Sequence, residues 1–314
     1  MKIENEILPG KYKDIKNYES FVKAKPVDKG FSGEEKYYIE AAGGKQLLLR
    51  VANADAYEYK KNMFNMMRSA AALNIPMPIP VDFGMCNSNK NVYMLLSWHE
   101  GEDLEKLMPS LSETTRYELG LKAGEILRKI HSVPMQERPK DWYSEYIKGA
   151  HEQIQEFNAT GVQIDGSDMI ARYFEKNKHL INDRPLSFRH GDYFTANLIV
   201  SENNDLYAID WDMYDCGDPW GEFSAAINNA DLFPHYMTGL IRGYFGGEPP
   251  AEFWTILSLY SSIGSFVAVC WAVYTNQPQE ALNSCVENVK NTLLWFDNMR
   301  NPVPTWYLKN YNAL

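Results

Sequence analysis

The residues that could carry out chemistry are concentrated in the middle of the chain. The triplet His190-Gly191-Asp192 is followed by Asn197, and an Ile-Asp-Trp-Asp run comes later at 209–212. Amide and carboxylate oxygens are hard ligands that suit Mg²⁺, which also accepts substrate phosphates. With Asn197 and Asp210 on the metal, Asp192 remains to accept the proton of an incoming hydroxyl. These are parts needed for phosphoryl transfer, and the segment therefore predicts that chemistry.

A hairpin must position these side chains. The apolar runs 198–200 and 206–209 flank a polar turn, and this pattern predicts two short paired strands. With the turn centred after Asn203, Asn197 faces Asp210 across the pair. The predicted pairing therefore returns Asp210 to the neighbourhood of Asn197, close to the His-Gly-Asp loop.

The first third of the chain has the pattern of a sheet with one helix. The Gly43-Gly44 pair can supply the positive φ angles of a tight hairpin, and the run Ile75–Pro80 predicts a stiff, extended exit from the helix. We expect strands at 21–29, 36–42, 45–51 and 92–98, and a helix at 56–72.

The rest of the chain is mostly helical in pattern. We expect helices at 112–132, 142–156 and 169–181, and over most of the chain after Phe223. The sequence therefore predicts an α+β protein with two lobes. The N-terminal lobe, 1–97, holds the sheet and its helix, and the larger C-terminal lobe, 98–314, is mainly helical.

The composition is that of a globular enzyme. The 314 residues suggest two domains or one core with two lobes, and 45% hydrophobic residues suffice for a sizeable core. The 41 acidic residues outnumber the 31 basic residues, for a net charge of −10. This balance argues against a nucleic-acid partner and suits a cationic or metal-bridged small ligand.

Two further features bear on location. The N-terminal residues lack an apolar signal segment, and the four cysteines are scattered without Cys-x-x-Cys spacing, which predicts reduced thiols in the cytoplasm. Residues 254–274 are long and apolar enough to cross a bilayer. Their serines, and the absence of a flanking Lys/Arg cluster, favour a helix buried in a globular lobe and no membrane partner.

The ordered motifs resemble those of the aminoglycoside phosphotransferase family. The family's order is His-Gly-Asp with a following Asn, then the Ile-Asp-Trp-Asp run, then Gly217-Asp218-Pro219. The resemblance runs from about Gly30 to at least Phe223. It implies a bilobal protein-kinase-like fold, shared with choline, homoserine, methylthioribose and macrolide kinases. It also implies ATP or GTP as the phosphoryl donor, with Mg²⁺.

The resemblance implies a role for each motif residue. Asp192 would be the catalytic base, and Asn197 and Asp210 would be the magnesium ligands. His190 would brace the loop, and Asp218 would fix the loop geometry through backbone hydrogen bonds.

The resemblance extends less exactly to the nucleotide side. Arg50 stands where the family has a lysine on the third strand, and arginine can hold phosphate oxygens in a fork. The family places an acidic partner on the next helix, but Glu58 lies about one turn too early and Met63 occupies that position. The remaining implied nucleotide contacts are Gly30, Ser32 and Gly33 over the phosphates, and Ser97, Trp98 and His99 at the base.

The acceptor is the least defined part of the prediction. Asp212, Asp215 and Glu222 follow the metal loop and could line a cleft for a cationic substrate, for which aminoglycosides are the first choice. Choline, homoserine or macrolides are alternatives, all accepting the phosphoryl group on a hydroxyl. A catalytically inactive, pseudokinase-like binding module is the alternative from another class, because Arg50 replaces the lysine. The sequence does not determine the oligomeric state.

Overall fold

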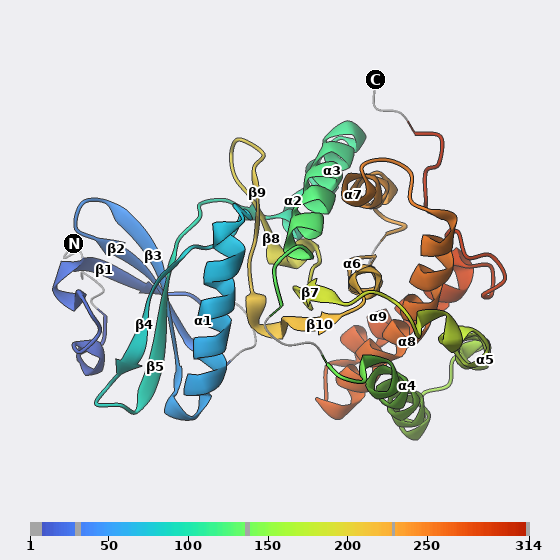
Figure 1. Ribbon diagram of the computed structural model, residues 1–314, viewed down its shortest axis with the longest axis horizontal. Coiled ribbons are helices and arrows are strands. Elements are labelled where there is room, and N and C mark those ends of the chain that lie inside the picture. The colour runs from blue at the N-terminus through green and yellow to red at the C-terminus, as the bar shows by residue number, and fades with distance from the viewer. Residues whose placement is uncertain (1–7, 29–32, 136–138, 228–229, 312–314) are drawn as a thin grey trace. The chain divides into compact units, whose positions relative to one another are not determined.

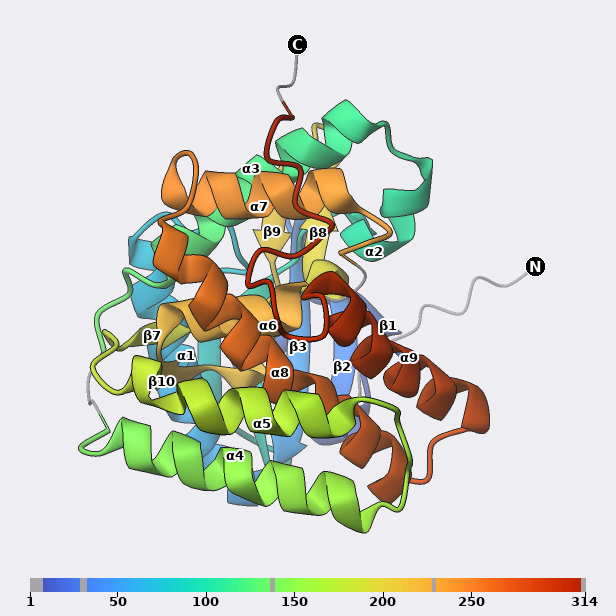
Figure 2. The same cartoon turned by 90° about the vertical axis from the view of Figure 1, so that its right-hand side faces the viewer.

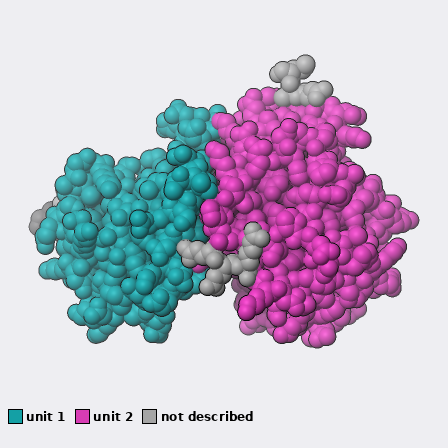
Figure 3. Space-filling model, in the orientation of Figure 1, with its two compact units in different colours: residues 1–103, 198–212 teal, residues 104–197, 213–314 magenta. Residues whose placement is uncertain are grey.

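A computed structural model of the chain describes residues 8–28, 33–135, 139–227 and 230–311. The chain divides into two compact units (Figure 3). Unit 1 consists of Met1–Asp103 and Leu198–Asp212, and unit 2 consists of Leu104–Asn197 and Met213–Leu314. The sequence prediction had two contiguous lobes meeting at residue 97. In the structure the central hairpin instead belongs to the same unit as the N-terminal sheet.

Unit 1 is built on a five-stranded antiparallel sheet with the strand order β1-β2-β3-β5-β4 (Figure 1). A smaller sheet has the order β6-β8-β9. The elements are β1 (Phe21–Pro26), β2 (Glu35–Ala41), β3 (Lys45–Asn53), α1 (Tyr57–Ala72), β4 (Pro80–Cys86), β5 (Asn91–Ser97), β6 (Glu102–Asp103), β8 (Leu198–Val200) and β9 (Leu206–Ala208).

Strand β3 presents two different faces because side chains alternate along a strand. Leu47, Leu49 and Val51 join the main core of unit 1, together with residues of β2 and β5. Arg50, from the opposite face, is 6% exposed. The β2–β3 turn uses Gly43 and Gly44 at φ +83° and +80°, which confirms the predicted hairpin.

Strand β4 was missed by the sequence analysis, which predicted only a stiff extended exit around Pro80. Proline cannot donate to a strand ladder, but it is tolerated at the start of an edge strand, and Pro80 occupies this position. Phe83 of β4 then packs against the rings of Tyr57 and Phe64 on α1, at centroid distances of 5.4 Å each. These contacts fix α1 against the sheet.

The central hairpin forms, but the predicted register was wrong by one residue. Leu198 pairs with Ala208, and Val200 with Leu206, so the register continued outward sets Asn197 opposite Ile209. The cause is the turn: Asn204 donates to the carbonyl of Ser201 and adopts φ +59°. This is the three-residue loop with one left-handed residue, rather than a two-residue turn.

Unit 2 contains most of the helices, and Figure 2 shows its α4, α5 and α8 packed together. Its described elements are α2 (Leu104–Leu107), α3 (Glu113–Ile130), α4 (Trp142–Ala159), α5 (Ser167–Asn177), β7 (Ser187–Arg189), β10 (Asp215–Gly217), α6 (Phe223–Ala226), α7 (Pro234–Phe245), α8 (Ala251–Tyr274) and α9 (Gln279–Trp295). Strands β7 and β10 pair antiparallel. Neither was predicted from the sequence, because these strands pair with each other across a long stretch of chain and not through a local turn.

Helix α8 is the apolar segment noted in the sequence. It has the length and composition of a membrane span, and 67% of its most apolar window is buried within the structure. Two of its serines are satisfied within the helix, because the hydroxyls of Ser258 and Ser262 donate to carbonyls one turn earlier. The packing is that of the core helix that the sequence analysis preferred.

Helices α3 and α7 cross at very short range, and they lie side by side in both ribbon views. Each helix carries two glycines four residues apart at the crossing. A Cβ at Gly124 would lie 2.1 Å from the carbonyl oxygen of Leu240, and one at Gly243 would lie 2.1 Å from that of Leu121. The crossing therefore depends on glycine from both helices.

We predict that Gly124→Ala lowers the free energy of unfolding by about 1–3 kcal/mol, because backbone cannot move aside as a side chain can. Gly149→Ala is the matched control: Gly149 lies in α4, and an added Cβ there meets nothing within 4 Å. We expect the control to be unchanged or stabilised by about 0.5–1 kcal/mol. Urea unfolding of both variants measures the difference, and equal midpoints would contradict the proposed crossing.

Candidate active site

The His-Gly-Asp loop follows β7 and lies within unit 2. Asn197 donates from Nδ2 to the carbonyl oxygen of Asp192 at 3.0 Å and to its carboxylate at 2.8 Å. Gly191 adopts φ +82°, and a Cβ there would lie 1.8 Å from the carbonyl oxygen of Met213. Only glycine fits this position. The loop thereby brings together two of the residues singled out in the sequence, Asp192 and Asn197.

The environment of Asp192 favours a proton acceptor. Burial raises the pKa of the Asp192 carboxyl above its ordinary value, against the opposing effect of the hydrogen bond from Asn197. The negative charge of Glu222 raises it further. A carboxylate with a raised pKa binds a proton more readily, as a general base requires.

Glu222 braces the loop, and its predicted role as a substrate residue is wrong. Its carboxylate accepts from the backbone N–H groups of His190 at 3.0 Å and Gly191 at 2.7 Å. The imidazole of His131 lies 3.1 Å from the same group. Glu222 is 4% exposed and both of its oxygens are occupied by these partners. It therefore positions the loop and has no free oxygen for an acceptor.

His190 is fully buried beneath the loop. Its Nδ1 accepts from the backbone N–H of Asp192 at 3.3 Å, and its ring meets that of Tyr193 edge to face. Tyr193 in turn donates to the carbonyl of Ala123 in α3. The imidazole therefore contacts the loop from inside, as a bracing residue would.

Asp218 is also fully buried, and side chains contribute more to its environment than the sequence analysis expected. It accepts from the backbone N–H of Trp220 at 3.0 Å, from Arg184 at 2.8 and 3.2 Å, and from Tyr260 at 2.9 Å. The guanidinium of Arg184 lies 3.6 Å above the Trp220 ring. Asp218 therefore links the Gly217-Asp218-Pro219 turn to α8.

The other residue of unit 2 that was predicted to contact the acceptor substrate, Asp215, lies on β10 opposite Arg189. The guanidinium of Arg189 donates to both carboxylate oxygens, at 2.8 and 2.5 Å. This fork pairs the charge, although Asp215 remains 46% exposed. Its predicted contact with an acceptor stays a prediction.

Unit 1 contains a buried ring of four charges around Arg50. Arg50 donates to the carboxylates of Glu34, at 2.6 Å, and Asp212. Lys60 of α1 contacts the same two carboxylates and lies 2.6 Å from that of Asp212. The four side chains are between 4% and 18% exposed. Two cations and two anions alternate around the ring, so their charges cancel.

The partner of Arg50 therefore comes from a different element than the family pattern suggests. Glu58 is 76% exposed and lies 4.0 Å from Lys61. Met63 of α1 is fully buried. The acidic partner is Glu34, which directly precedes β2, and the helix supplies Lys60 instead of a glutamate. The carboxylate of Asp212 is held by Arg50 and Lys60, and its predicted contact with an acceptor stays a prediction.

Asp210 lies beside this ring, 4.0 Å from Arg50, and is 35% exposed. Burial, together with the hydrogen bond and charge of Asp212, raises the pKa of Asp210 to about 6, against the opposing charge of Arg50. The same surroundings have the opposite effect on Asp212: although burial raises its pKa, Arg50 and the hydrogen bonds that it accepts lower it overall. Asp210 is thus the carboxylate that lacks full charge compensation.

The donor set fits a magnesium ion. Both hydrogen bonds of Asn197 are donated by Nδ2, so its amide oxygen points the other way and can serve as a ligand. Asp210 offers a carboxylate that a cation would stabilise in its ionised form. Both are hard oxygens of the kind that Mg²⁺ prefers. Among the described residues there is no group of three or more His, Cys, Asp or Glu that could hold a metal.

The predicted base-binding segment follows β5. The hydroxyl oxygen of Ser97 accepts from the backbone N–H of Ile79 at 2.8 Å. The same oxygen lies 3.1 Å from Nε2 of His99. The backbone N–H of Trp98 donates to the carbonyl oxygen of Gln46 on β3 at 3.1 Å. Because of this bond, the N–H group is not available to bind a nucleotide base. His99 stacks on Tyr207 of β9 at a centroid distance of 4.1 Å.

The predicted phosphate loop is only partly described. Gly30 and Ser32 lie outside the described residues. Gly33 adopts φ +67° with open space around it, a conformation that glycine adopts without strain. It immediately precedes Glu34, and the loop therefore leads directly into the charge ring.

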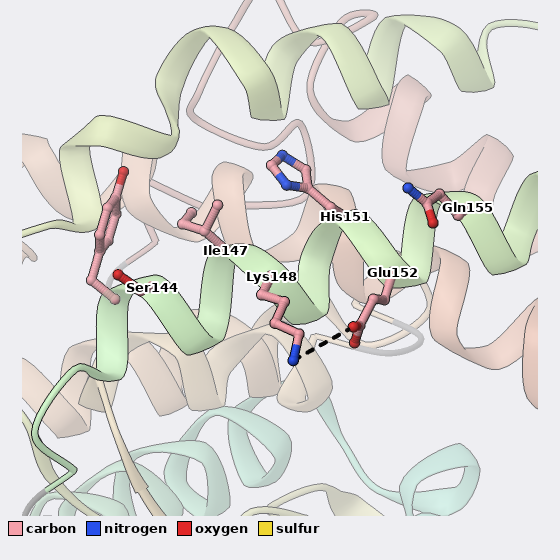
Figure 4. Close-up of a pocket in the computed structure, with 7 residues that line it drawn as sticks. Ser144, Ile147, Lys148, His151, Glu152 and Gln155 are labelled. Atoms are coloured by element: carbon pink, nitrogen blue, oxygen red, sulfur yellow. Dashed lines mark ion pairs between the residues drawn. The ribbon is translucent and has the colours of Figure 1, made fainter.

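A separate hollow of about 500 Å³ lies on the surface of α4 (Figure 4). Its lining comes from this helix alone, and Lys148 and Glu152 are 4.0 Å apart on one side. None of the residues predicted for the site lines it. The hollow therefore has no connection with the predicted chemistry.

The sequence analysis missed Glu34, Lys60, Arg184, Arg189 and His131. No motif contains them, and each is recognised only through a charged partner far away in the chain. One local signal existed for Lys60, because a lysine on the buried face of an amphipathic helix needs a counter-charge. Its partner could not have been named without the fold.

The fold and the site together define a kinase-like phosphotransferase. A model of the phosphotransferase enzyme family, APH, matches residues 23–254, and the chain belongs to this family. This confirms the predicted family and fold class. A search of curated proteins found no match.

Solved structures share the fold at low sequence identity. Aminoglycoside phosphotransferase APH(4)-Ia is 17% identical with a TM-score of 0.62, over 87% of this chain and 94% of that chain. A choline/ethanolamine kinase family protein from Mesorhizobium loti is 16% identical with a TM-score of 0.62, over 93% and 95%. Amicoumacin kinase hAmiN, in complex with AMP-PNP, Ca²⁺ and amicoumacin, is 12% identical with a TM-score of 0.58, over 90% of each chain.

We predict that Glu222→Gln destabilises the protein by about 2–4 kcal/mol near neutral pH, because an amide cannot accept from all three donors. Burial raises the pKa of Glu222, but the hydrogen bond and charge of His131 outweigh it and lower the pKa below its ordinary value. A lowered carboxyl pKa contributes stability that is present above the ordinary value and is lost as pH falls through the folded value. The variant should therefore lose less stability on acidification than the parent.

The measurement is urea unfolding at a series of pH values. Glu202→Gln is the control, since Glu202 is exposed in the β8–β9 turn. If the free energy of unfolding changed equally with pH in the parent and in Glu222→Gln, the lowered pKa assigned to Glu222 would be contradicted.

Proposed function

We propose that the protein phosphorylates a hydroxyl of a small molecule, using the γ-phosphoryl group of ATP or GTP. Family membership supports the class of reaction. The observation that carries the proposal is the Asp192–Asn197 pair, held on a glycine turn whose backbone is braced by a buried glutamate. A binding module without chemistry has no need of a braced loop that presents a carboxylate of raised pKa.

Each residue has a defined part in this proposal. Asp192 orients the acceptor hydroxyl and takes its proton as the oxygen attacks the γ-phosphorus. The bond between that phosphorus and the β–γ bridging oxygen breaks, and the nucleoside diphosphate leaves. Arg50, positioned by Glu34, holds phosphate oxygens, and the segment 97–99 contacts the base.

Asn197 and Asp210 would hold Mg²⁺, which, when bound, neutralises the charge on the phosphates. A solved relative crystallised with Ca²⁺ and AMP-PNP supports a divalent cation together with a nucleotide. Mg²⁺ itself rests on the chemistry of the two oxygen ligands.

An aminoglycoside-like, cationic acceptor remains the first candidate. A thermostable mutant of APH(4)-Ia was crystallised with AMP-PNP and hygromycin B, which supports this choice. The pairing of Asp215 with Arg189 and of Glu222 with His131 leaves fewer free carboxylates for a polycation than the sequence suggested. An acceptor with a single positive charge, such as an amino alcohol, is therefore the second candidate, and the Mesorhizobium loti relative supports it.

The proposed location is the cytoplasm. The four cysteines are free thiols in the structure, as a reducing compartment requires. Nucleoside triphosphates are also available there. We propose neither a nucleic-acid nor a membrane partner.

We predict that Asp192→Asn lowers kcat by a factor of about 10²–10⁴, because the proton acceptor is lost while the side chain keeps its size. Nucleotide binding should persist. Asp205→Asn is the control, since Asp205 is exposed at the end of the central turn. A coupled assay for nucleoside diphosphate measures turnover. An unchanged rate in Asp192→Asn would reject the role, and nucleotide binding without turnover of any acceptor by the parent would favour the pseudokinase alternative.

We also predict that the true acceptor raises the melting temperature in the presence of AMP-PNP and Mg²⁺. A ligand at 100 times its dissociation constant stabilises the protein by about 2.7 kcal/mol. The panel should contain aminoglycosides, choline, ethanolamine, homoserine and macrolides. Stabilisation by a polycation with none by amino alcohols would identify the first candidate, and the reverse result would identify the second.

A further inference from the structure

Two side chains of helix α1 contact Asp212, the last residue of the segment 210–212. Lys60 donates to the Asp212 carboxylate at 2.6 Å, and the hydroxyl of Tyr59 donates to the Asp212 backbone carbonyl. Two consecutive residues of the helix thus hold the side chain and the main chain of the same residue. All of these residues belong to unit 1.

The segment that they hold is strained. Asp210 adopts φ +62°, in the left-handed region, which costs residues other than glycine free energy, although aspartate and asparagine adopt it more readily than the rest. Such a conformation persists only where surrounding contacts impose it. Tyr59 and Lys60 contact Asp212, two residues after Asp210, and so fix the backbone that follows Asp210.

Core packing does not explain these contacts. Tyr59 is 46% exposed, and its ring therefore adds little to the buried core. Lys60 is buried but charged, and a buried ion pair is on its own a weak source of stability. The shared target, Asp212, is the feature that both contacts have in common.

We infer that Tyr59 and Lys60 are positioning residues that hold Asp210 in its ligand conformation through Asp212. The inference rests on the proposed function, since it assigns Asp210 to the metal. The helix then differs from the family pattern in the charge that it supplies. In the family pattern it supplies a carboxylate, whereas here α1 supplies the cation of Lys60 to Asp212, and Glu34 pairs with Arg50.

The test is hydrogen–deuterium exchange on the protein without metal or nucleotide. Tyr59→Phe and Lys60→Met should raise the exchange rate of residues 209–212 roughly tenfold, and the rest of unit 1 should be unaffected. Lys60→Arg should preserve protection, because it keeps the charge. Lys61→Met is the matched control, since Lys61 is 47% exposed and contacts Glu58. Tyr59→Phe removes one hydroxyl from an exposed ring and does not threaten the fold.

A second measurement follows the metal directly. Binding of Mn²⁺ with ADP, detected by electron paramagnetic resonance, should weaken about 10- to 100-fold in Lys60→Met and recover in Lys60→Arg. Unchanged exchange at 209–212 in both Tyr59→Phe and Lys60→Met would overturn the inference. A uniform rise in exchange across unit 1 would also overturn it, by indicating general destabilisation.

Failure of the proposed function gives a different result. In that case the parent protein binds no Mn²⁺ with ADP, while the local change in exchange still appears in the variants. The two hypotheses can therefore be rejected separately.

Discussion

Charge removed from water must be compensated, and in this protein that constraint organises the charged residues within each of the two units. In unit 2 the carboxylate of Glu222 is paired with two backbone N–H groups and His131, and this pairing shapes the loop that carries Asp192. In unit 1 the ring of Glu34, Arg50, Asp212 and Lys60 compensates itself. Asp210 lies at the edge of this ring, 4.0 Å from Arg50, and is less fully compensated than Asp212.

The same constraint explains which parts of the molecule could be predicted from sequence. Short-range patterns were reliable: the Gly43-Gly44 hairpin, helix α1 and the apolar helix α8 follow from local rules of turns and periodicity. The three motif segments were specific enough to predict the family and the fold class. Asp192 and Asn197 interact within one motif segment, but Asp212 and Asp218 pair with residues far away in the chain.

The errors have two physical causes. Turn geometry set the hairpin register, because a left-handed Asn204 makes a three-residue loop whose register differs by one residue from that of a two-residue turn. Pairing across the fold determined the other outcomes. Glu222 resembled a substrate carboxylate in sequence, and only the tertiary structure brings the backbone of His190 and Gly191 to its oxygens. A sequence shows that a charge exists, but the fold decides which partner neutralises it.

Arg50 illustrates how far a family pattern can be carried over. A basic residue on the third strand needs an acidic partner, and any element that reaches it can supply one. Here Glu34, the residue directly before β2, supplies the partner, which leaves α1 free to carry the opposite charge. Arginine suits this arrangement better than lysine, because its planar fork can hold Glu34 and Asp212 at the same time and still face Asp210. The replacement of lysine is thus part of a rearranged ion-pair network, and it does not by itself indicate loss of catalysis.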